Sequence, residues 1–159
     1  MDRGIDASST WEAWSRNPVT GLPGRRAIRH ALRREVARAE RHGHTLGVAL
    51  IDPGISPAVH GEYLCELCYA ICLALRAGDE VCIRDSGDIL LLLPEIPADR
   101  LGVRLRAVST AASAAVSSAA GMPMLRWGAA LYPRDGQCPD SLLRASLAAM
   151  TAGSPAGND

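Results

Sequence analysis

The chain has 159 residues, 48% of them hydrophobic, with a formal net charge of +0 and a pI near 6.9. This length and composition suit one domain with a single buried core and argue against two folded domains. All 17 basic residues are arginine, 17 acidic residues balance them, and aromatic side chains make up 4% of the chain. Because it lacks both a positive overall field and a set of stacking rings, we expect no nucleic-acid partner.

Residues 1–16 read as an N-terminal leader ahead of the domain. The leader is largely polar, and Trp11 and Trp14 are its aromatic residues, which we expect to dock on the body or on a partner. It has no apolar run of the signal-peptide kind, and no later stretch reaches the roughly 18 to 20 apolar residues that span a bilayer. Five cysteines, an odd number, fit a reducing compartment. The sequence therefore predicts a cytoplasmic location.

Helices and strands are expected to alternate after the leader. In chain order they are a helix over 25–42, a strand over 46–51, a helix over 61–75, strands over 81–84 and 89–93, a helix over 99–119, a strand over 125–131 and a helix over 141–151. The helical segments carry apolar residues every three or four positions, whereas the strands are compact apolar runs. The residues between the two middle strands, D-S-G-D, indicate a hairpin. This pattern predicts an α/β (α+β) sandwich with helices packed over a sheet.

Cysteines gather on the second expected helix. Cys65, Cys68 and Cys72 follow a C-x-x-C-x-x-x-C spacing, and Cys82 lies on the next strand. Such a set has the residue types of a metal site. The same spacings also suit small buried side chains on an apolar helix stripe. We expect the second role and no bound metal.

Two segments carry a resemblance to a known family. Residues 17–26, N-P-V-T-G-L-P-G-R-R, resemble the opening motif of GGDEF domains, D-x-L-T-G-L-x-N-R, with Asn17 for Asp and Gly24 for Asn. Residues 76–94 can be laid without a gap on the family's R-x-x-D motif, its signature hairpin and an apolar strand closed by proline. That order of features is fairly specific.

The C-terminal part continues the resemblance. Residues 127–136, W-G-A-A-L-Y-P-R-D-G, resemble the family's S-x-G-x-A-x-Y-P-x-D-G, and residues 142–150 stand where it has L-L-x-x-A-D-x-A-L-Y. Residues 17–159 are therefore identified as a degenerate GGDEF domain. The resemblance implies a central mixed sheet flanked by helices, similar to the palm of polymerases and nucleotidyl cyclases.

The resemblance also implies a diguanylate cyclase ancestry, a reaction in which carboxylate-bound divalent metal helps join two GTP molecules. Asp52 stands at the family's first metal-binding position. The gapless alignment places Asp85, Ser86, Gly87, Asp88 and Ile89 over the G-G-D/E-E-F signature, so glycine replaces the second metal-binding acid. If Arg84 is matched instead to the family's arginine before the signature, the reading starts at Ser86. One acid is lost in either alignment.

Other parts of the cyclase site are also missing. Side chains at the first two signature positions obstruct the close backbone approach that glycine allows. The segment 53–60 is about eight residues shorter than the family pattern and lacks the Asn and Asp that read guanine, a loss of several kcal/mol of binding and discrimination. The chain has no lysine to contact phosphates. We therefore expect no catalytic residue, no cofactor, no metal and no enzyme activity.

One ligand site of the family is retained in sequence. Arg76 and Asp79 match its R-x-x-D inhibitory motif, which binds the product cyclic di-GMP, and Arg104 is the candidate second basic residue. An arginine fork can donate to guanine O6 and N7 or to phosphate, and a carboxylate can accept from guanine N–H groups. The competing interpretation is structural, because an arginine is favoured at a helix end and Asp79 can cap the turn.

These residues lead to three functional hypotheses. The first is an inactive signalling domain that binds cyclic di-GMP through the R-x-x-D pair and relays occupancy to a protein partner. The second is an interaction or scaffold module that kept only the fold and binds no nucleotide, and the third is a residual GTP-binding enzyme. The family's enzymes act as dimers, so a homodimer stays open for this chain.

Overall fold

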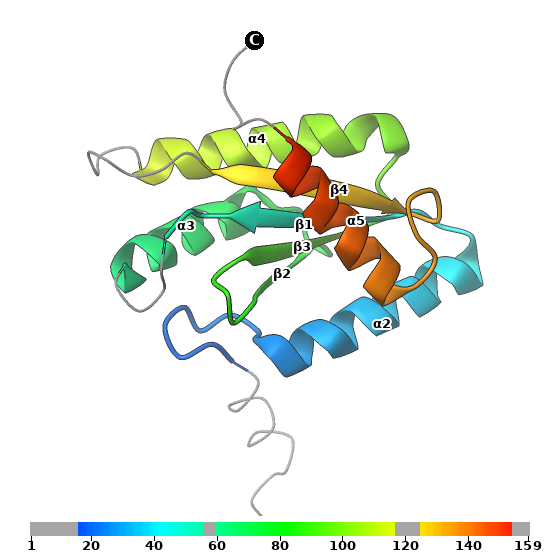
Figure 1. The fold of residues 1–159 in the computed structure, drawn as a ribbon, viewed down its shortest axis with the longest axis horizontal. Helices are drawn as coiled ribbons and strands as arrows, with labels where there is room; N and C mark the ends of the chain where they lie inside the picture. The colour runs from blue at the N-terminus through cyan, green and yellow to red at the C-terminus, as the bar shows by residue number, and fades with distance from the viewer. Residues whose placement is uncertain (1–15, 56–59, 117–124, 154–159) are drawn as a thin grey trace, which may run out of the picture.

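The computed structural model describes residues 16–55, 60–116 and 125–153. Four strands form its sheet: β1 (Leu46–Asp52), β2 (Glu80–Ile83), β3 (Ile89–Pro94) and β4 (Arg126–Tyr132). Their order is β2-β3-β1-β4, so β1 and β3 lie in the middle (Figure 1). All three pairings are antiparallel. The predicted α+β fold class is confirmed, but the sheet is antiparallel where a mixed one was expected.

Helices cover both faces of this sheet. The helices α2 (Arg25–His42) and α5 (Pro139–Ala152) pack on one face, and α5 crosses the sheet obliquely in Figure 1. The helices α3 (Gly61–Ala74) and α4 (Ala98–Val116) pack together on the other face. None of the helices in the described ranges is long and apolar enough to cross a membrane.

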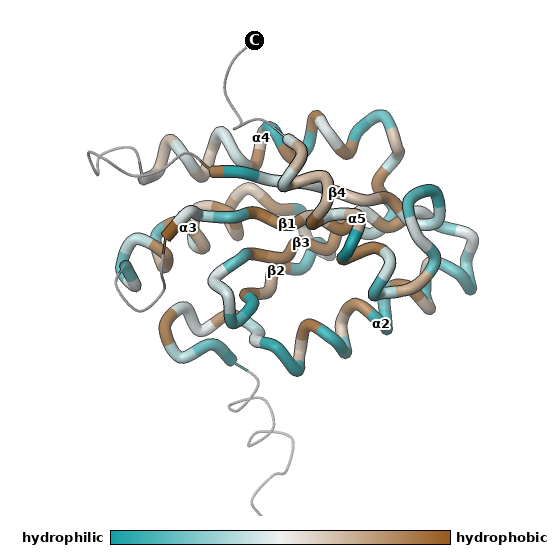
Figure 2. The backbone as a smooth tube through the Cα atoms, viewed as in Figure 1, coloured by the Kyte–Doolittle hydropathy of each residue, from teal (hydrophilic) through white to brown (hydrophobic). Residues whose placement is uncertain are grey.

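The sheet supplies the centre of two hydrophobic clusters. Six of the seven β1 residues are buried, as are the five leucine and isoleucine residues of β3. Because side chains alternate along a strand, Ala49 and Ile51 join the cluster under α3 and α4, while Val48 and Leu50 join the cluster under α2 and α5. Figure 2 shows the central strands β1 and β3 as mostly hydrophobic and α2 as alternately hydrophobic and hydrophilic. This helix therefore covers the sheet with one side alone.

The observed elements begin and end within about three residues of the predicted ones where both can be compared. The largest shift at a helix start is at α5, which begins at Pro139 because Ser141 caps it. The Ser141 hydroxyl accepts a hydrogen bond from the backbone N–H of Cys138 (3.2 Å) and donates to the Cys138 carbonyl (2.9 Å). The last three residues of the predicted helix 99–119, and both tryptophans of the leader, lie outside the described residues.

Candidate functional site

The opening motif folds into a turn that is fixed to the sheet. The side-chain oxygen of Asn17 accepts hydrogen bonds from the backbone N–H groups of Val19 (2.9 Å) and Thr20 (3.0 Å). The carbonyl of Pro23 then accepts from the backbone N–H of Ile83 (3.0 Å) at the end of β2. Asparagine therefore supplies the capping acceptor here, as an aspartate would, and the motif lies beside the β2–β3 hairpin.

Asp52, the candidate first metal ligand, has both carboxylate oxygens engaged by the protein. Oδ1 accepts from the backbone N–H of Gly54 (2.7 Å), and Oδ2 accepts from the Arg126 guanidinium. The β1–β4 register places these two residues directly opposite each other. The Arg126 guanidinium thus supplies the positive charge beside the Asp52 carboxylate. This pair could not be predicted from the sequence, because the strand register brings the two residues together.

The residues aligned with the family's signature form the predicted hairpin. Its backbone is closed by a hydrogen bond from the Arg84 N–H to the Asp88 carbonyl (2.8 Å) and by one from the Gly87 N–H to the Arg84 carbonyl (2.9 Å). Gly87 has a φ of 90°, a conformation that favours glycine, which gives this residue a structural reason to be glycine rather than an acid. Ile89 is fully buried in the core.

Asp88, the acidic residue that follows Gly87, is bonded to other side chains of the same hairpin. Asp88 Oδ2 accepts from the Ser86 hydroxyl (3.0 Å) and pairs with the Arg84 guanidinium (3.5 Å). Asp85 lies at the exposed tip, with a long ion pair to Arg25 (3.9 Å). Within the described ranges, no three His, Cys, Asp or Glu side chains gather in an arrangement that could hold a metal ion.

The R-x-x-D residues form a tight turn between α3 and β2. The backbone N–H of Arg76 donates to Asp79 Oδ2 (2.9 Å), the N–H of Asp79 donates to the Arg76 carbonyl (3.1 Å), and Gly78 has a φ of 100°. The Arg76 guanidinium reaches Asp79 Oδ1 (3.2 Å) and the Pro94 carbonyl (3.4 Å). Both members of the predicted pair therefore meet, with Asp79 capping the turn.

Arg104 joins this pair from α4. Its Nη2 lies 3.7 Å from Asp79 Oδ2 and donates to the carbonyl of Ala74, the last residue of α3 (2.8 Å). Its Nε is buried without a hydrogen-bond partner. The structure thus brings together the three residues predicted as a ligand site, although Arg104 follows Arg76 by 28 positions along the chain.

The three side chains of this corner differ in how much of each is exposed to solvent. The Asp79 carboxylate is 2% exposed, whereas the Arg76 side chain is 48% exposed and that of Arg104 is 27% exposed. A ligand arriving from solvent would therefore meet the Arg76 guanidinium first. Asp79 holds the Arg76 guanidinium in place, because its carboxylate accepts hydrogen bonds from both the backbone N–H and the guanidinium of Arg76.

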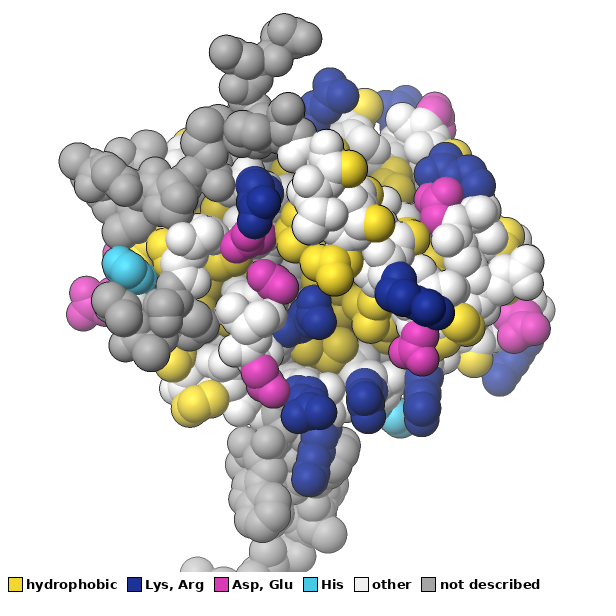
Figure 3. Space-filling view, viewed as in Figure 1, with side chains coloured by type: hydrophobic (Ala, Val, Ile, Leu, Met, Phe, Trp, Pro, Cys, Tyr) yellow, Lys and Arg dark blue, Asp and Glu magenta, His cyan; other side chains and the backbone are white. Residues whose placement is uncertain are grey.

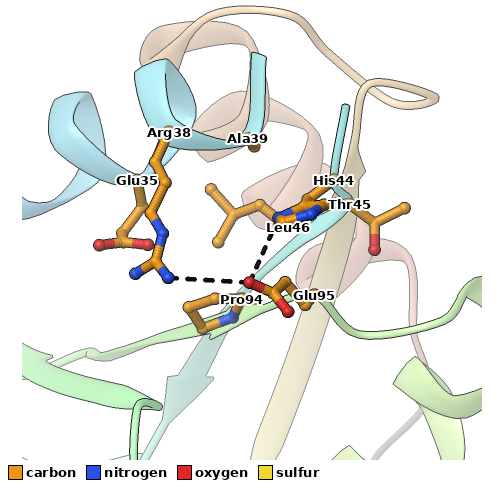
Figure 4. Close-up of a pocket in the computed structure, with 8 residues that line it drawn as sticks. All are labelled: Glu35, Arg38, Ala39, His44, Thr45, Leu46, Pro94 and Glu95. Carbon is orange, nitrogen blue, oxygen red and sulfur yellow. Dashed lines mark ion pairs between the residues drawn. The ribbon is translucent and has the colours of Figure 1, made fainter. Parts of the chain in front are cut away.

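One surface hollow, near the C-terminal end of α2, is too small to be a ligand site. It lies between the last turns of α2, the start of β1 and the end of β3, and it has a volume of about 10 Å³, room for one water molecule at most. Figure 4 shows Glu95 at its centre, where its carboxylate pairs with His44 Nδ1 (3.2 Å) and with Arg38 (3.7 Å). We interpret this cluster as structural.

The cysteines of α3 do not form a shared site. Cys68 is buried, Cys72 is exposed, and the thiol of Cys65 donates to the Val19 carbonyl (3.0 Å). All five cysteines of the chain are free thiols. Burial raises the pKa of Cys68 and that of Cys82 to about 12 each, whereas a hydrogen bond with Ser141 lowers the pKa of the exposed Cys138.

Alkylation should follow this order of pKa and exposure. At pH 8 a thiol with a pKa of about 12 is ionised to about one part in ten thousand, so Cys68 and Cys82 should resist iodoacetamide in the folded protein. Cys138 should be modified first, as measured by mass spectrometry of peptides over time. Denaturant should make all five react, and early labelling of Cys68 would contradict the buried position.

Comparison with known proteins gives a consistent result at the level of structure. No protein-family profile and no curated protein matches the sequence. The GGDEF domain of YfiN (TpbB) from Pseudomonas aeruginosa is 23% identical with a TM-score of 0.69, covering 86% of this chain and 87% of that one. The GGDEF domain of DgcB from Caulobacter crescentus, in complex with c-di-GMP, is 19% identical with a TM-score of 0.73, covering 87% and 88%.

A larger neighbour is the diguanylate cyclase SiaD of Pseudomonas aeruginosa, solved with its activator SiaC. It is 25% identical with a TM-score of 0.75, and the match covers 91% of this chain and 60% of that one. These likenesses agree with the order of motifs along the sequence and with the antiparallel sheet between two helical layers. This chain therefore has the fold of a GGDEF domain, the diguanylate cyclase fold.

Proposed function

We propose that this chain is a catalytically inactive GGDEF-like signalling domain of the bacterial cytoplasm that binds cyclic di-GMP through Arg76, Asp79 and Arg104 and relays occupancy to a protein partner. The observation that carries the proposal is the meeting of these three side chains at one corner between α3, β2 and α4. The complex of DgcB with c-di-GMP supports the choice of ligand.

Loss of catalysis is supported by the state of the two acidic positions. Asp52 is neutralised by Arg126, so a divalent cation would have to displace a guanidinium before it could bind there. The second acid is replaced by Gly87 in a conformation that suits glycine, and Asp88 is bonded within its own hairpin. Two-metal or one-metal activation of a GTP hydroxyl therefore has no ready set of carboxylates at this end of the sheet.

Binding at the R-x-x-D corner is supported by its residual positive charge. One buried carboxylate faces two guanidiniums, and Arg76 keeps about half of its side chain open to solvent. Arginine donates in a planar fork that matches phosphate oxygens or the O6 and N7 edge of guanine. Arg76 is therefore the residue we expect to contact the ligand, with Asp79 as the group that orients it.

A second function, that of a nucleotide-independent interaction module, is favoured by one observation. Asp79 is nearly inaccessible, so it can accept from guanine only if the turn opens or an arginine moves away. If the corner does not open, the same three side chains simply join α3 to α4. The two functions predict opposite results in one titration.

Calorimetry with cyclic di-GMP should show binding to the wild type that is weakened in Arg76→Ala. A charge-assisted hydrogen bond contributes about 1.5 to 3 kcal/mol, which corresponds to about 10- to 100-fold in affinity. Arg106→Ala is the matched control, because it removes an exposed arginine from α4 without touching Asp79. Asp79→Ala is unsuitable here, since loss of this buried group also changes stability.

The outcomes separate the hypotheses. Binding that is lost in Arg76→Ala and kept in Arg106→Ala supports the receptor. No heat of binding in the folded wild type leaves the interaction module. Formation of cyclic di-GMP from GTP with Mg²⁺ or Mn²⁺ would overturn the proposal of an inactive domain.

A further inference from the structure

A large groove lies on the side of the sheet away from Arg76 and Asp79. Its volume is about 440 Å³, and it runs between α2, the tip of the β2–β3 hairpin and the first turn of α5. We call it the arginine groove after the basic residues that line it: Arg25, Arg29, Arg33 and Arg84. Figure 3 shows basic side chains in a row over α2, next to a hydrophobic hollow.

The arginines of α2 form a stripe of like charge. Arg25, Arg29 and Arg33 are four residues apart and so lie on one face of the helix, an arrangement that costs a few tenths of a kcal/mol per pair. The side chains of Arg29 and Arg33 make no ion pair with any other described residue. Arg29 and Arg33 therefore lack a negatively charged partner among the described residues, and an acidic ligand can supply one.

The remaining lining residues add apolar side chains and place negative charge on the wall opposite α2. Ile28 and Leu32 of α2 are 6% and 1% exposed and form the floor of the groove, while the half-buried Leu143 faces them from α5. Asp140 lies on the α5 side, and Asp85 at the hairpin tip is already paired with Arg25. A negatively charged group is attracted to the α2 wall and repelled from the α5 wall.

Spacing distinguishes the kinds of acidic ligand. Residues four apart on a helix rise by about 6 Å, so the stripe presents positive charge at intervals of about 6 Å. Alternate side chains of an extended peptide recur at about 6.6 to 6.8 Å and share one side of the chain. Adjacent phosphates of one diphosphate are closer together than this. A helix about 10 Å in diameter occupies about 400 Å³ per turn, so a groove of about 440 Å³ holds only about one turn of it, less than the length of the three-arginine stripe.

We propose that the arginine groove binds an extended acidic segment of a protein partner. Its alternate carboxylates face Arg25, Arg29 and Arg33, and its intervening apolar side chains face Leu143. This inference names the partner's chemistry but does not depend on cyclic di-GMP, because the groove and the Arg76 corner lie on opposite faces of the sheet.

A fluorescein-labelled octapeptide of alternating aspartate and valine is the probe, since β-branched residues favour the extended chain. Its anisotropy should rise on titration with the full chain at low salt without cyclic di-GMP. The double variant Arg29→Ala, Arg33→Ala should bind at least about tenfold more weakly, because each lost Arg–carboxylate contact is worth about 1.5 to 3 kcal/mol. Arg41→Ala with Arg106→Ala is the matched control, which removes two exposed arginines elsewhere and should bind like the wild type.

Circular dichroism should show that both double variants are folded. Equal affinity of the two variants, or absence of binding to the wild type, would overturn the proposal. Equal binding of an alternating lysine–valine peptide would show that charge does not select the ligand. Tighter binding of an alanine-rich helix with glutamates four apart, or displacement by pyrophosphate below the peptide concentration, would assign the groove to another ligand. Failure here leaves the Arg76 titration unaffected, so the two proposals are tested separately.

Discussion

Gly128→Val should prevent the domain from folding. A Cβ atom on Gly128 would lie 2.1 Å from the backbone nitrogen of Met150 and 2.4 Å from the carbonyl oxygen of Ser146. Both atoms belong to the backbone of α5, which cannot turn aside as a flexible side chain can. Because α5 would have to separate from β4, we expect a loss of more than about 4 kcal/mol, a large part of the stability of a domain this size. Denaturant unfolding followed by circular dichroism measures it.

Gly102→Ala supplies the control for this result. Gly102 lies within α4, and a Cβ there meets no atom within 4 Å. Alanine in a helix is favoured over glycine by about 0.5 to 1 kcal/mol, so this variant should be slightly more stable than the wild type. If Gly128→Val unfolded at the same denaturant concentration as the wild type, the close contact between α5 and β4 would be wrong.

Asp79→Ala should be the most destabilising change at the Arg76 corner. Asp79 is 2% exposed, and its removal leaves the guanidiniums of Arg76 and Arg104 facing each other without a counter-charge. A fully buried pair broken in this way costs about 3 to 5 kcal/mol, but both arginines are partly solvated, so we expect about 2 to 3 kcal/mol. The measurement is again the free energy of unfolding in urea.

Two further variants test whether the loss of stability in Asp79→Ala comes from unpaired buried charge. Asp85→Ala removes an exposed carboxylate whose ion pair is 3.9 Å long, and it should change stability by less than about 0.5 kcal/mol. Adding Arg104→Met to Asp79→Ala should recover part of the loss, because it removes one unpaired charge while keeping apolar bulk. A loss as small as that of Asp85→Ala would mean that Asp79 is solvated rather than buried.

Secondary structure could be predicted because local signals agree with the fold. The apolar stripe of 25–42 and the cap at Gly43 fix α2, and the leucine and isoleucine run of 89–93 can only be a buried strand in so short a segment. The hairpin of β2 and β3 follows from the D-S-G-D turn, but the antiparallel pairings of β1 with β3 and with β4 could not be deduced in this way. Which strands become neighbours depends on contacts between segments about 40 and 80 residues apart.

The candidate sites show the same division between local and distant contacts. Arg76 and Asp79 are three residues apart, and their turn was readable from the motif. The third member, Arg104, reaches Asp79 from another helix, and this contact depends on tertiary packing. Arg126 carried no signal in sequence, because its partner Asp52 becomes apparent once strand register is known. The four-residue spacing of Arg25, Arg29 and Arg33 can be read from the sequence, but the groove beside them is made by the hairpin and α5.

The central position of β1 also bears on how the protein forms as it is synthesised. β1 pairs with β3 on one side and with β4 on the other, and β4 ends at Tyr132. A ribosome releases the chain from its N-terminus, so one edge of this apolar strand has no partner until most of the chain has been made. Unpaired apolar strands are templates for association with other chains. The nascent domain is therefore most exposed to aggregation just before its last strand and helix emerge, and this is when a chaperone would have most to protect.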